Sequence, residues 1–285
     1  MHEIIAVLGA GVMGAGIARV LGRAGHEVRV FDVDPAAAAS AAASAGASAH
    51  DSVEAAVTGA TIVLEAAPER LELKRALLAQ VEAANADAVI ASNTSSIAPD
   101  ALAAGMRDPS RLVIAHFFNP ADTVPLVEVV PGPETPTATV ERMVALLTAA
   151  GKTAVPLAQQ VEGFIANRLQ AALYREAMHL VERGIATPEQ VDLAVTAGLG
   201  PRWALAGPFE IMDLGGLDVW RSVTDGILPT LGDASAAPAM LRERAERGDL
   251  GAKTGQGFLP RDADAPALFA ARLAALIEAR DALRP

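Results

Sequence analysis

The chain has 285 residues, of which 52% are hydrophobic, and a formal net charge of -11 at pH 7. This length is too great for one average domain and too small for three, so we expect two domains with a large apolar core. An acidic surface repels nucleic-acid phosphates and anionic bilayers, which argues against both as partners. The sequence contains no cysteine, so disulfides and thiolate metal sites are excluded, and we expect no bound metal.

The N-terminus leads directly into an apolar strand, without the charged leader and cleavage site of a secreted precursor. No stretch approaches the roughly 18 apolar residues that a membrane-spanning helix needs. We therefore expect a cytoplasmic protein that acts on a small molecule.

Short apolar runs alternate with helical stretches in the first half of the chain, which predicts a parallel sheet wrapped by helices. Residues 68–84 form one such helix, opened by Pro68. Residues 36–49, almost all Ala, Ser and Gly, predict a short surface helix and then a strand. The other expected strands are residues 4–8, 28–32, 61–65, 88–92, 112–117, 127–130 and 153–157.

Helical patterns replace strand patterns after Val161, at residues 164–183, 188–197 and 266–279. Thr187 is expected to cap the second of these helices, with Pro188 in its first turn. The predicted organisation is an N-terminal α/β domain at residues 1–160, with a Rossmann-type, doubly wound parallel sheet, and an all-helical C-terminal domain at residues 161–285.

Gly9, Gly11 and Gly14 form a G-x-G-x-x-G motif between the first strand and the helix after it. In that context the first glycine makes a tight turn, the second lets the backbone approach a pyrophosphate, and the third lets the helix pack on the sheet. Val12 and Met13, at the helix N-terminus, are expected to contact the same anion. The alternative is that the glycines only close a tight turn.

Asp32 ends the second predicted strand, where a carboxylate accepts hydrogen bonds from the adenosine ribose and repels a 2′-phosphate. This favours NAD over NADP as the cofactor. FAD-binding proteins use the same glycine motif, but a flavoprotein of this length would be unusual.

Five polar residues, from Ser92 to Ser96, follow the strand at 88–92, at the carboxyl edge of the sheet where ligands bind in this architecture. Their hydroxyl and amide groups can hold a substrate oxygen. The alternative is a polar loop that caps a helix.

His116 ends the strand at 112–117, and a lone histidine there is more often a buried side chain than a catalyst. Glu128 lies twelve residues further on, at the start of the next predicted strand. Two adjacent strand ends can place this carboxylate against the imidazole, which orients the ring and stabilises its protonated form. Oxidation of a hydroxyl by NAD needs such a base.

Seven sequence blocks, in the same order, resemble the 3-hydroxyacyl-CoA dehydrogenase family over nearly the whole chain. They are GAGVMGAGIA from Gly9, LEAAPERLELK from Leu64, SNTSSI from Ser92, HFFNP from His116, GFIANRL from Gly163, GPFEIMDLGGLDV from Gly207 and GAKTGQGF from Gly251. The resemblance implies an enzyme of fatty acid metabolism that transfers a hydride between NAD and the 3-hydroxyl carbon of an L-3-hydroxyacyl substrate. It also implies a homodimer formed through the helical domain, which the apolar circumference of the helix at 164–183 supports.

The same resemblance assigns roles to residues. His116 is the acid/base, Glu128 orients it, and Ser95 and Asn167 bind the substrate oxygen. Further residues near the carbonyl or along the cofactor are Asn119, Glu65, Lys74 and Asn93.

Two segments depart from the family. Residues 33–60 replace a long helical excursion that helps to clamp coenzyme A, and they contain no Lys or Arg to pair with its phosphates. Residues 200–204 resemble instead the relatives that oxidise carnitine or sugar acids. Arg202 could pair there with a substrate carboxylate and Trp203 could pack on its chain, or the pair could be a surface arginine and a core tryptophan.

The predicted substrate is therefore a 3-hydroxyacyl-CoA or a free 3-hydroxy acid. Other possibilities are a dehydrogenase of carnitine, a sugar acid or an imine, and a non-catalytic NAD-binding sensor or structural protein. The 6-phosphogluconate-like hydroxyacid group is disfavoured, because it uses a lysine on the helix where this chain has Asn167.

Overall fold

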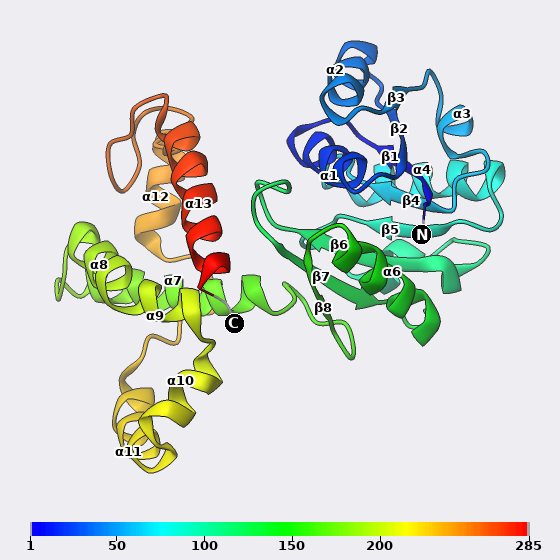
Figure 1. Cartoon of the computed structure of the whole chain (residues 1–285). Helices are drawn as coiled ribbons and strands as arrows, with labels where there is room; N and C mark the ends of the chain where they lie inside the picture. Colours follow the sequence, from blue (N-terminus) through cyan, green and yellow to red (C-terminus); the bar gives the residue numbers. More distant parts are fainter. Residues whose placement is uncertain (1, 284–285) are drawn as a thin grey trace. The chain divides into compact units, whose positions relative to one another are not determined.

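The computed structural model describes residues 2–283, which form two compact units divided between Asn167 and Arg168 (Figure 1). The first unit is an α/β sandwich and the second is built of helices. The predicted domain boundary, at residues 160–161, lies in the segment that leads to this division. No helix among the described residues is both long and apolar enough to cross a membrane.

The first unit is built on an eight-stranded sheet in the order β3-β2-β1-β4-β5-β6-β7-β8. The seven strands predicted from apolar runs are all present, and the alanine-rich run forms α2 and β3 as expected. The strands are β1 (Ile4–Leu8), β2 (Glu27–Phe31), β3 (Ser48–Ala49), β4 (Ile62–Glu65), β5 (Val89–Ser92), β6 (Leu112–Phe117), β7 (Leu126–Pro131) and β8 (Thr153–Pro156).

Helices cover both faces of the sheet, as a doubly wound fold requires. Buried side chains of α1 (Val12–Arg23), α2 (Pro35–Ala45) and α6 (Thr137–Ala149) pack against one face. Those of α3 (Val53–Val57), α4 (Leu71–Ala84) and α5 (Pro99–Ala103) pack against the other. The chain order reverses between β1 and β4, so the carboxyl ends of these two strands flank the crevice where this architecture binds ligands.

One strand pair, β6 with β7, is antiparallel, whereas every other pair is parallel. The apolar runs predicted a parallel sheet and did not reveal this antiparallel pair. The connection between these strands spans only residues 118–125, and a parallel connection needs a crossover of a dozen residues or more. The antiparallel register places His116 directly opposite Glu128.

Between residues 168 and 283, the part of the second unit that the structure describes, the regular elements are helices and one isolated bridge, between Gly251 and Gln256. Thr187 caps α8 with a full capping box, as predicted, and the helix then continues into a π-helical turn at Val195–Leu199. The helices are α7 (Ala166–Glu182), whose first residues belong to the first unit, α8 (Pro188–Ala194), α9 (Gly200–Leu205), α10 (Pro208–Gly215), α11 (Leu217–Ile227), α12 (Ala239–Arg247) and α13 (Ala265–Ala282).

Candidate active site

The glycine-rich turn between β1 and α1 contains two glycines that the fold itself requires. Gly9 has φ +102°, and a Cβ there would lie 2.7 Å from the carbonyl oxygen of Ala66. A Cβ on Gly14 would lie 1.8 Å from the carbonyl oxygen of Gly9. Neither position accepts a side chain, because the backbone just after β4 and the turn itself occupy the space.

Gly11 differs, because a Cβ there would meet no protein atom within 4 Å. It is the N-cap of α1, and no side chain caps this helix. The N–H groups of the first turn, including those of Val12 and Met13, have no acceptor within the helix. No side chain of the N-cap residue supplies one, so they are available to a ligand. This arrangement fits the pyrophosphate of a dinucleotide, which would use the space that a side chain would fill.

Asp32 lies beside the same turn, just past the end of β2. Its Oδ2 accepts a hydrogen bond of 2.6 Å from the N–H of Ala10, and its Oδ1 accepts one of 2.9 Å from Asp34. These bonds hold the carboxylate against the glycine turn. Each oxygen has a second acceptor position left, which fits the ribose contact predicted for NAD.

His116 and Glu128 meet as cross-strand neighbours on β6 and β7. The imidazole Nδ1 lies 2.9 Å from Glu128 Oε2, and the two residues are 5% and 1% exposed. The ring also contacts those of Phe118 and Phe164, at centroid distances of 4.7 and 5.3 Å. The pair therefore lies in a largely apolar setting, with the carboxylate fixing the plane of the imidazole.

Glu128 is also bound by the start of α7. Its Oε1 accepts hydrogen bonds of 2.8 and 2.9 Å from the N–H groups of Ile165 and Ala166. Burial raises the pKa of Glu128, but the bonds from His116 and from these two N–H groups outweigh it, so the pKa lies below its usual value. Glu128 is thus a carboxylate at neutral pH.

This carboxylate determines which nitrogen of His116 carries the proton. A carboxylate only accepts, so Nδ1 must donate to it, and Nε2 of the neutral ring then holds a lone pair. Nε2 takes part in no described hydrogen bond among residues 2–283, and it is not one of the fully buried atoms that lack a partner. It is the atom that can exchange a proton with a ligand.

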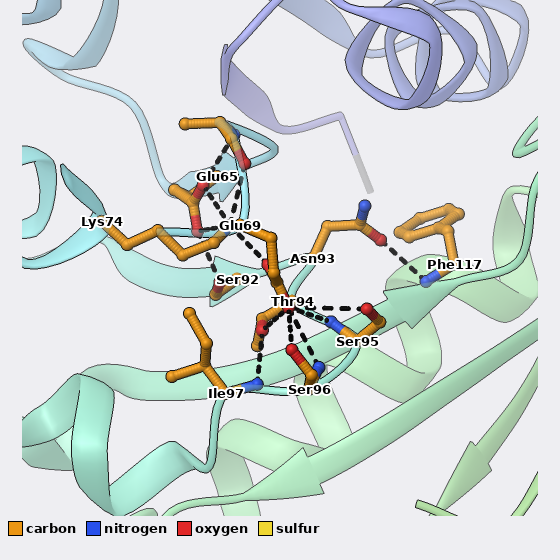
Figure 2. Close-up of polar contacts among 11 residues, drawn as sticks. Glu65, Glu69, Lys74, Ser92, Asn93, Thr94, Ser95, Ser96, Ile97 and Phe117 are labelled. Carbon is orange, nitrogen blue, oxygen red and sulfur yellow. Dashed lines mark hydrogen bonds and ion pairs between the residues drawn. The ribbon is translucent and has the colours of Figure 1, made fainter. Parts of the chain in front are cut away.

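The polar loop after β5 approaches the same edge of the sheet. Asn93 Oδ1 accepts a hydrogen bond of 2.9 Å from the N–H of Phe117, the residue after His116, so the loop is joined to β6 (Figure 2). The amide nitrogen of Asn93 takes part in no described bond. Ser95 is exposed, and its hydroxyl lies 3.4 Å from Glu69 Oε1, too far for a strong hydrogen bond. The hydroxyl is therefore available to a substrate.

Glu65 and Lys74 lie beneath this loop. They are 0% and 1% exposed, and Lys74 Nζ lies 2.8 and 3.0 Å from the two carboxylate oxygens of Glu65. Ser92 and the backbone of Ala67 complete the bonds of the pair. We predicted that both residues contact the cofactor. The polar atoms of both side chains are hydrogen-bonded within the protein. Any effect of Glu65 and Lys74 on a ligand is therefore indirect and depends on the residues to which they are bonded.

Glu69 is a further carboxylate at this edge of the sheet, and it was not predicted from the sequence. It lies between β4 and α4, and its Oε1 accepts bonds from the loop after β5 (Figure 2). Its position in the sequence could have indicated it. Glu69 follows β4 at the carboxyl edge of the sheet, in the same LEAAPERLELK segment as Glu65 and Lys74.

The remaining predicted residues are less tightly held. Asn119 is exposed in the connection after β6, and Asn167 is half-buried in the first turn of α7, and neither side chain has a described hydrogen bond. In the second unit, Arg202 Nε donates to the carbonyl of Gly198 at 3.3 Å. Trp203 is 44% exposed. No group of three or more His, Asp or Glu residues in the described part of the chain could hold a metal ion.

Known proteins are similar to this chain in both sequence and fold. The family model of the 3-hydroxyacyl-CoA dehydrogenase NAD binding domain matches residues 4–55 and 41–161, and that of the C-terminal domain matches residues 163–260. A 5-formyl-3-hydroxy-2-methylpyridine 4-carboxylate 5-dehydrogenase of Mesorhizobium japonicum is 33% identical over 279 residues, 90% of each chain. An L-carnitine dehydrogenase of Streptomyces coelicolor is 42% identical over 233 residues, 74% of this chain and 73% of its own.

Solved structures agree with this assignment. A 5-formyl-3-hydroxy-2-methylpyridine 4-carboxylic acid 5-dehydrogenase, an NAD+-dependent dismutase, matches with a TM-score of 0.92 at 32% identity, over 98% of both chains. An (S)-3-hydroxybutyryl-CoA dehydrogenase from Ralstonia eutropha matches with a TM-score of 0.75 at 30% identity, over 92% of this chain and 100% of that one. The chain belongs to the 3-hydroxyacyl-CoA dehydrogenase family of NAD-dependent enzymes.

Proposed function

We propose that this protein oxidises the hydroxyl group of a small 3-hydroxy acid that carries a free carboxylate, with His116 as the acid/base. The observation that carries the proposal is the geometry of the pair. Glu128 accepts from Nδ1 of His116 and from two backbone N–H groups, which leaves Nε2 of a well-oriented ring as a base.

In the oxidation direction, His116 Nε2 takes the proton of the substrate hydroxyl, and Glu128 stabilises the imidazolium that forms. When bound, NAD accepts the hydride that leaves C3. The Ser95 hydroxyl and the Asn167 amide donate hydrogen bonds to the substrate oxygen as negative charge develops on it. In the reverse direction His116 returns the proton to that oxygen. Asn119 and Asn93 are assigned to contacts beside the reacting carbon and the cofactor.

The structure of residues 33–60 supports a substrate without coenzyme A. Helix α2 ends at Ala45, β3 joins the sheet at Ser48, and α3 has only five residues, so no helical projection stands on this side of the unit. The segment also contains no Lys or Arg to pair with phosphates. For recognition of the substrate carboxylate and chain we propose Arg202 and Trp203.

The experiment is to measure NADH formation at mildly alkaline pH with L-3-hydroxybutyrate, L-carnitine and L-gulonate, in parallel with L-3-hydroxybutyryl-CoA. We expect a free acid to show the highest kcat/KM. A preference for the thioester would contradict the proposed substrate class. Absence of NADH with all four compounds, from protein that binds NAD, would favour the sensor or structural protein.

We also propose that the protein is a homodimer formed through its helical unit. All buried hydrophobic side chains among the described residues belong to the first unit, whereas Phe209 and Leu214 in the second are each 77% exposed. The helical unit also has an apolar cavity of about 840 Å³ between α7, α8, α12 and α13. Exposed apolar surface of this kind is typical of a face that a second copy covers. Sedimentation should give the mass of a dimer, and a stable monomer would contradict this.

We propose a cytoplasmic location as well, because a chain without cysteine gives no sign of adaptation to an oxidising compartment.

A further inference from the structure

Glu69 holds the loop that carries Ser95 through hydrogen bonds to three of its residues. Its Oε1 lies 2.6 Å from Thr94 Oγ1, 2.9 Å from Ser95 N and 3.0 Å from Ser96 N. The hydroxyl of Ser96 lies 2.9 Å from the same oxygen. One carboxylate oxygen therefore binds three consecutive residues of the loop (Figure 2).

The other oxygen of Glu69 faces the buried ion pair. Its Oε2 lies 3.5 Å from Lys74 Nζ, and Lys74 is held by Glu65 at 2.8 Å. The carboxylate is thus fixed from both sides. Burial raises the pKa of Glu69, but the hydrogen bonds from Thr94, Ser96 and Ser95 and the charge of Lys74 outweigh it and lower the pKa to about 2. Glu69 is an acceptor throughout the working pH range.

The distances distinguish the Ser95 hydroxyl from the other donors. A carboxylate oxygen has about two acceptor positions, and five donors surround this one. The Ser95 hydroxyl, at 3.4 Å, is the most distant of them. It can therefore turn to a substrate oxygen, while the backbone N–H of Ser95 stays bound to Glu69.

We propose that Glu69 is a positioning residue, which holds the backbone of the Ser95 loop so that the Ser95 hydroxyl meets the substrate oxygen. This inference rests on the proposed function, in which Ser95 binds that oxygen. Glu69 acts through Ser95, so its contribution should disappear when the Ser95 hydroxyl is removed.

A double-mutant cycle tests this dependence. Ser95→Ala should lower kcat about 100-fold, as the loss of a donor to a developing oxyanion does. Glu69→Gln keeps an acceptor but loses the charge that faces Lys74, and it should lower kcat about tenfold, a loss equal to one well-placed hydrogen bond. In the Ser95→Ala background, Glu69→Gln should change kcat less than about twofold, because no hydroxyl is left to position. The KM for NAD should stay within about twofold in every variant.

Glu72→Gln is the matched control, because Glu72 lies three residues further on, in the first turn of α4, where its side chain is 85% exposed and pairs only weakly with Arg75, at 3.5 Å. It should leave kcat unchanged. A tenfold loss from Glu69→Gln in both backgrounds, a loss confined to the KM for NAD, or no loss at all would each overturn the positioning role. The cycle is measured with the substrate that the wild type oxidises best. A failure of the proposed substrate class would therefore appear as a preference for the thioester in the substrate comparison, and the double-mutant cycle could still be measured with that thioester.

Discussion

The first unit contains two buried pairs of ionisable side chains, one fully hydrogen-bonded within the protein and one not. The comparison between them shows which property distinguishes a candidate active site. Lys74 and Glu65 are 1% and 0% exposed, and every charged atom of this pair is bonded within the protein. His116 and Glu128 are nearly as buried, at 5% and 1%. The difference is that Nε2 of His116 takes part in no hydrogen bond described among residues 2–283. Burial and pairing are common to both, and only the unbonded nitrogen can exchange a proton with a ligand.

The first prediction separates the two pairs by activity. His116→Gln should lower kcat about 1000-fold, because it removes the only proposed base and keeps a donor for Glu128. NAD should still bind with nearly the wild-type Kd. Steady-state rates and a calorimetric NAD titration measure these quantities. A variant that retains a tenth or more of the wild-type kcat would remove His116 from the mechanism.

Lys74→Met should act on stability instead. The substitution leaves the Glu65 carboxylate buried and unpaired, and breaking a buried ion pair in this way costs about 3–5 kcal/mol. Urea unfolding followed by circular dichroism measures the loss. Arg70→Met is the control, because Arg70 is exposed at the N-cap of the same helix and its side chain has no described hydrogen bond or ion pair. Equal stability of the Lys74 and Arg70 variants would show that the buried pair is not structural.

A third prediction concerns the glycine turn. Gly11→Ala should weaken NAD binding about tenfold, equivalent to about 1.4 kcal/mol, and leave the unfolding midpoint unchanged, because the new methyl group meets only the cofactor. Gly14→Ala should instead destabilise the fold, since its Cβ would lie 1.8 Å from a backbone oxygen. Wild-type NAD affinity in the Gly11 variant would place the pyrophosphate elsewhere.

A fourth prediction, also of modest size, concerns Glu69 at acid pH. Its pKa is lowered from 4.5 to about 2, so the stability that it contributes is present above pH 4.5 and is lost as the pH falls toward 2. Between pH 6 and pH 3 the wild type should lose about 1–2 kcal/mol more than Glu69→Gln, after allowance for the solvent screening of a partly exposed carboxylate. Parallel unfolding curves for the two proteins would contradict the lowered pKa.

Much of this site could be predicted from the sequence, for physical reasons. Apolar runs predicted the strands. The positions of His116 and Glu128 at adjacent strand ends predicted the contact between their side chains. The antiparallel pairing of β6 with β7 was not predicted, although the short connection between the two predicted strands favours it.

Glu69 was missed because its bonding partners, Thr94, Ser95 and Ser96, lie about 26 residues away in the chain. The burial of Glu65 and Lys74 was missed for a related reason, because charged residues are read from sequence as surface residues unless a partner is known. In each case the decisive contact joins separate segments of the fold.

The most direct test of the central claim is to follow the hydride itself. The 3-hydroxy acid that the wild type oxidises best would be deuterated at C3, and the reduced cofactor would be analysed by mass spectrometry for the wild type and for His116→Gln. The account predicts deuterium in the reduced cofactor formed by the wild type, and only trace reduction by the His116 variant at saturating NAD. Unlabelled reduced cofactor, or equal reduction by both proteins, would contradict it.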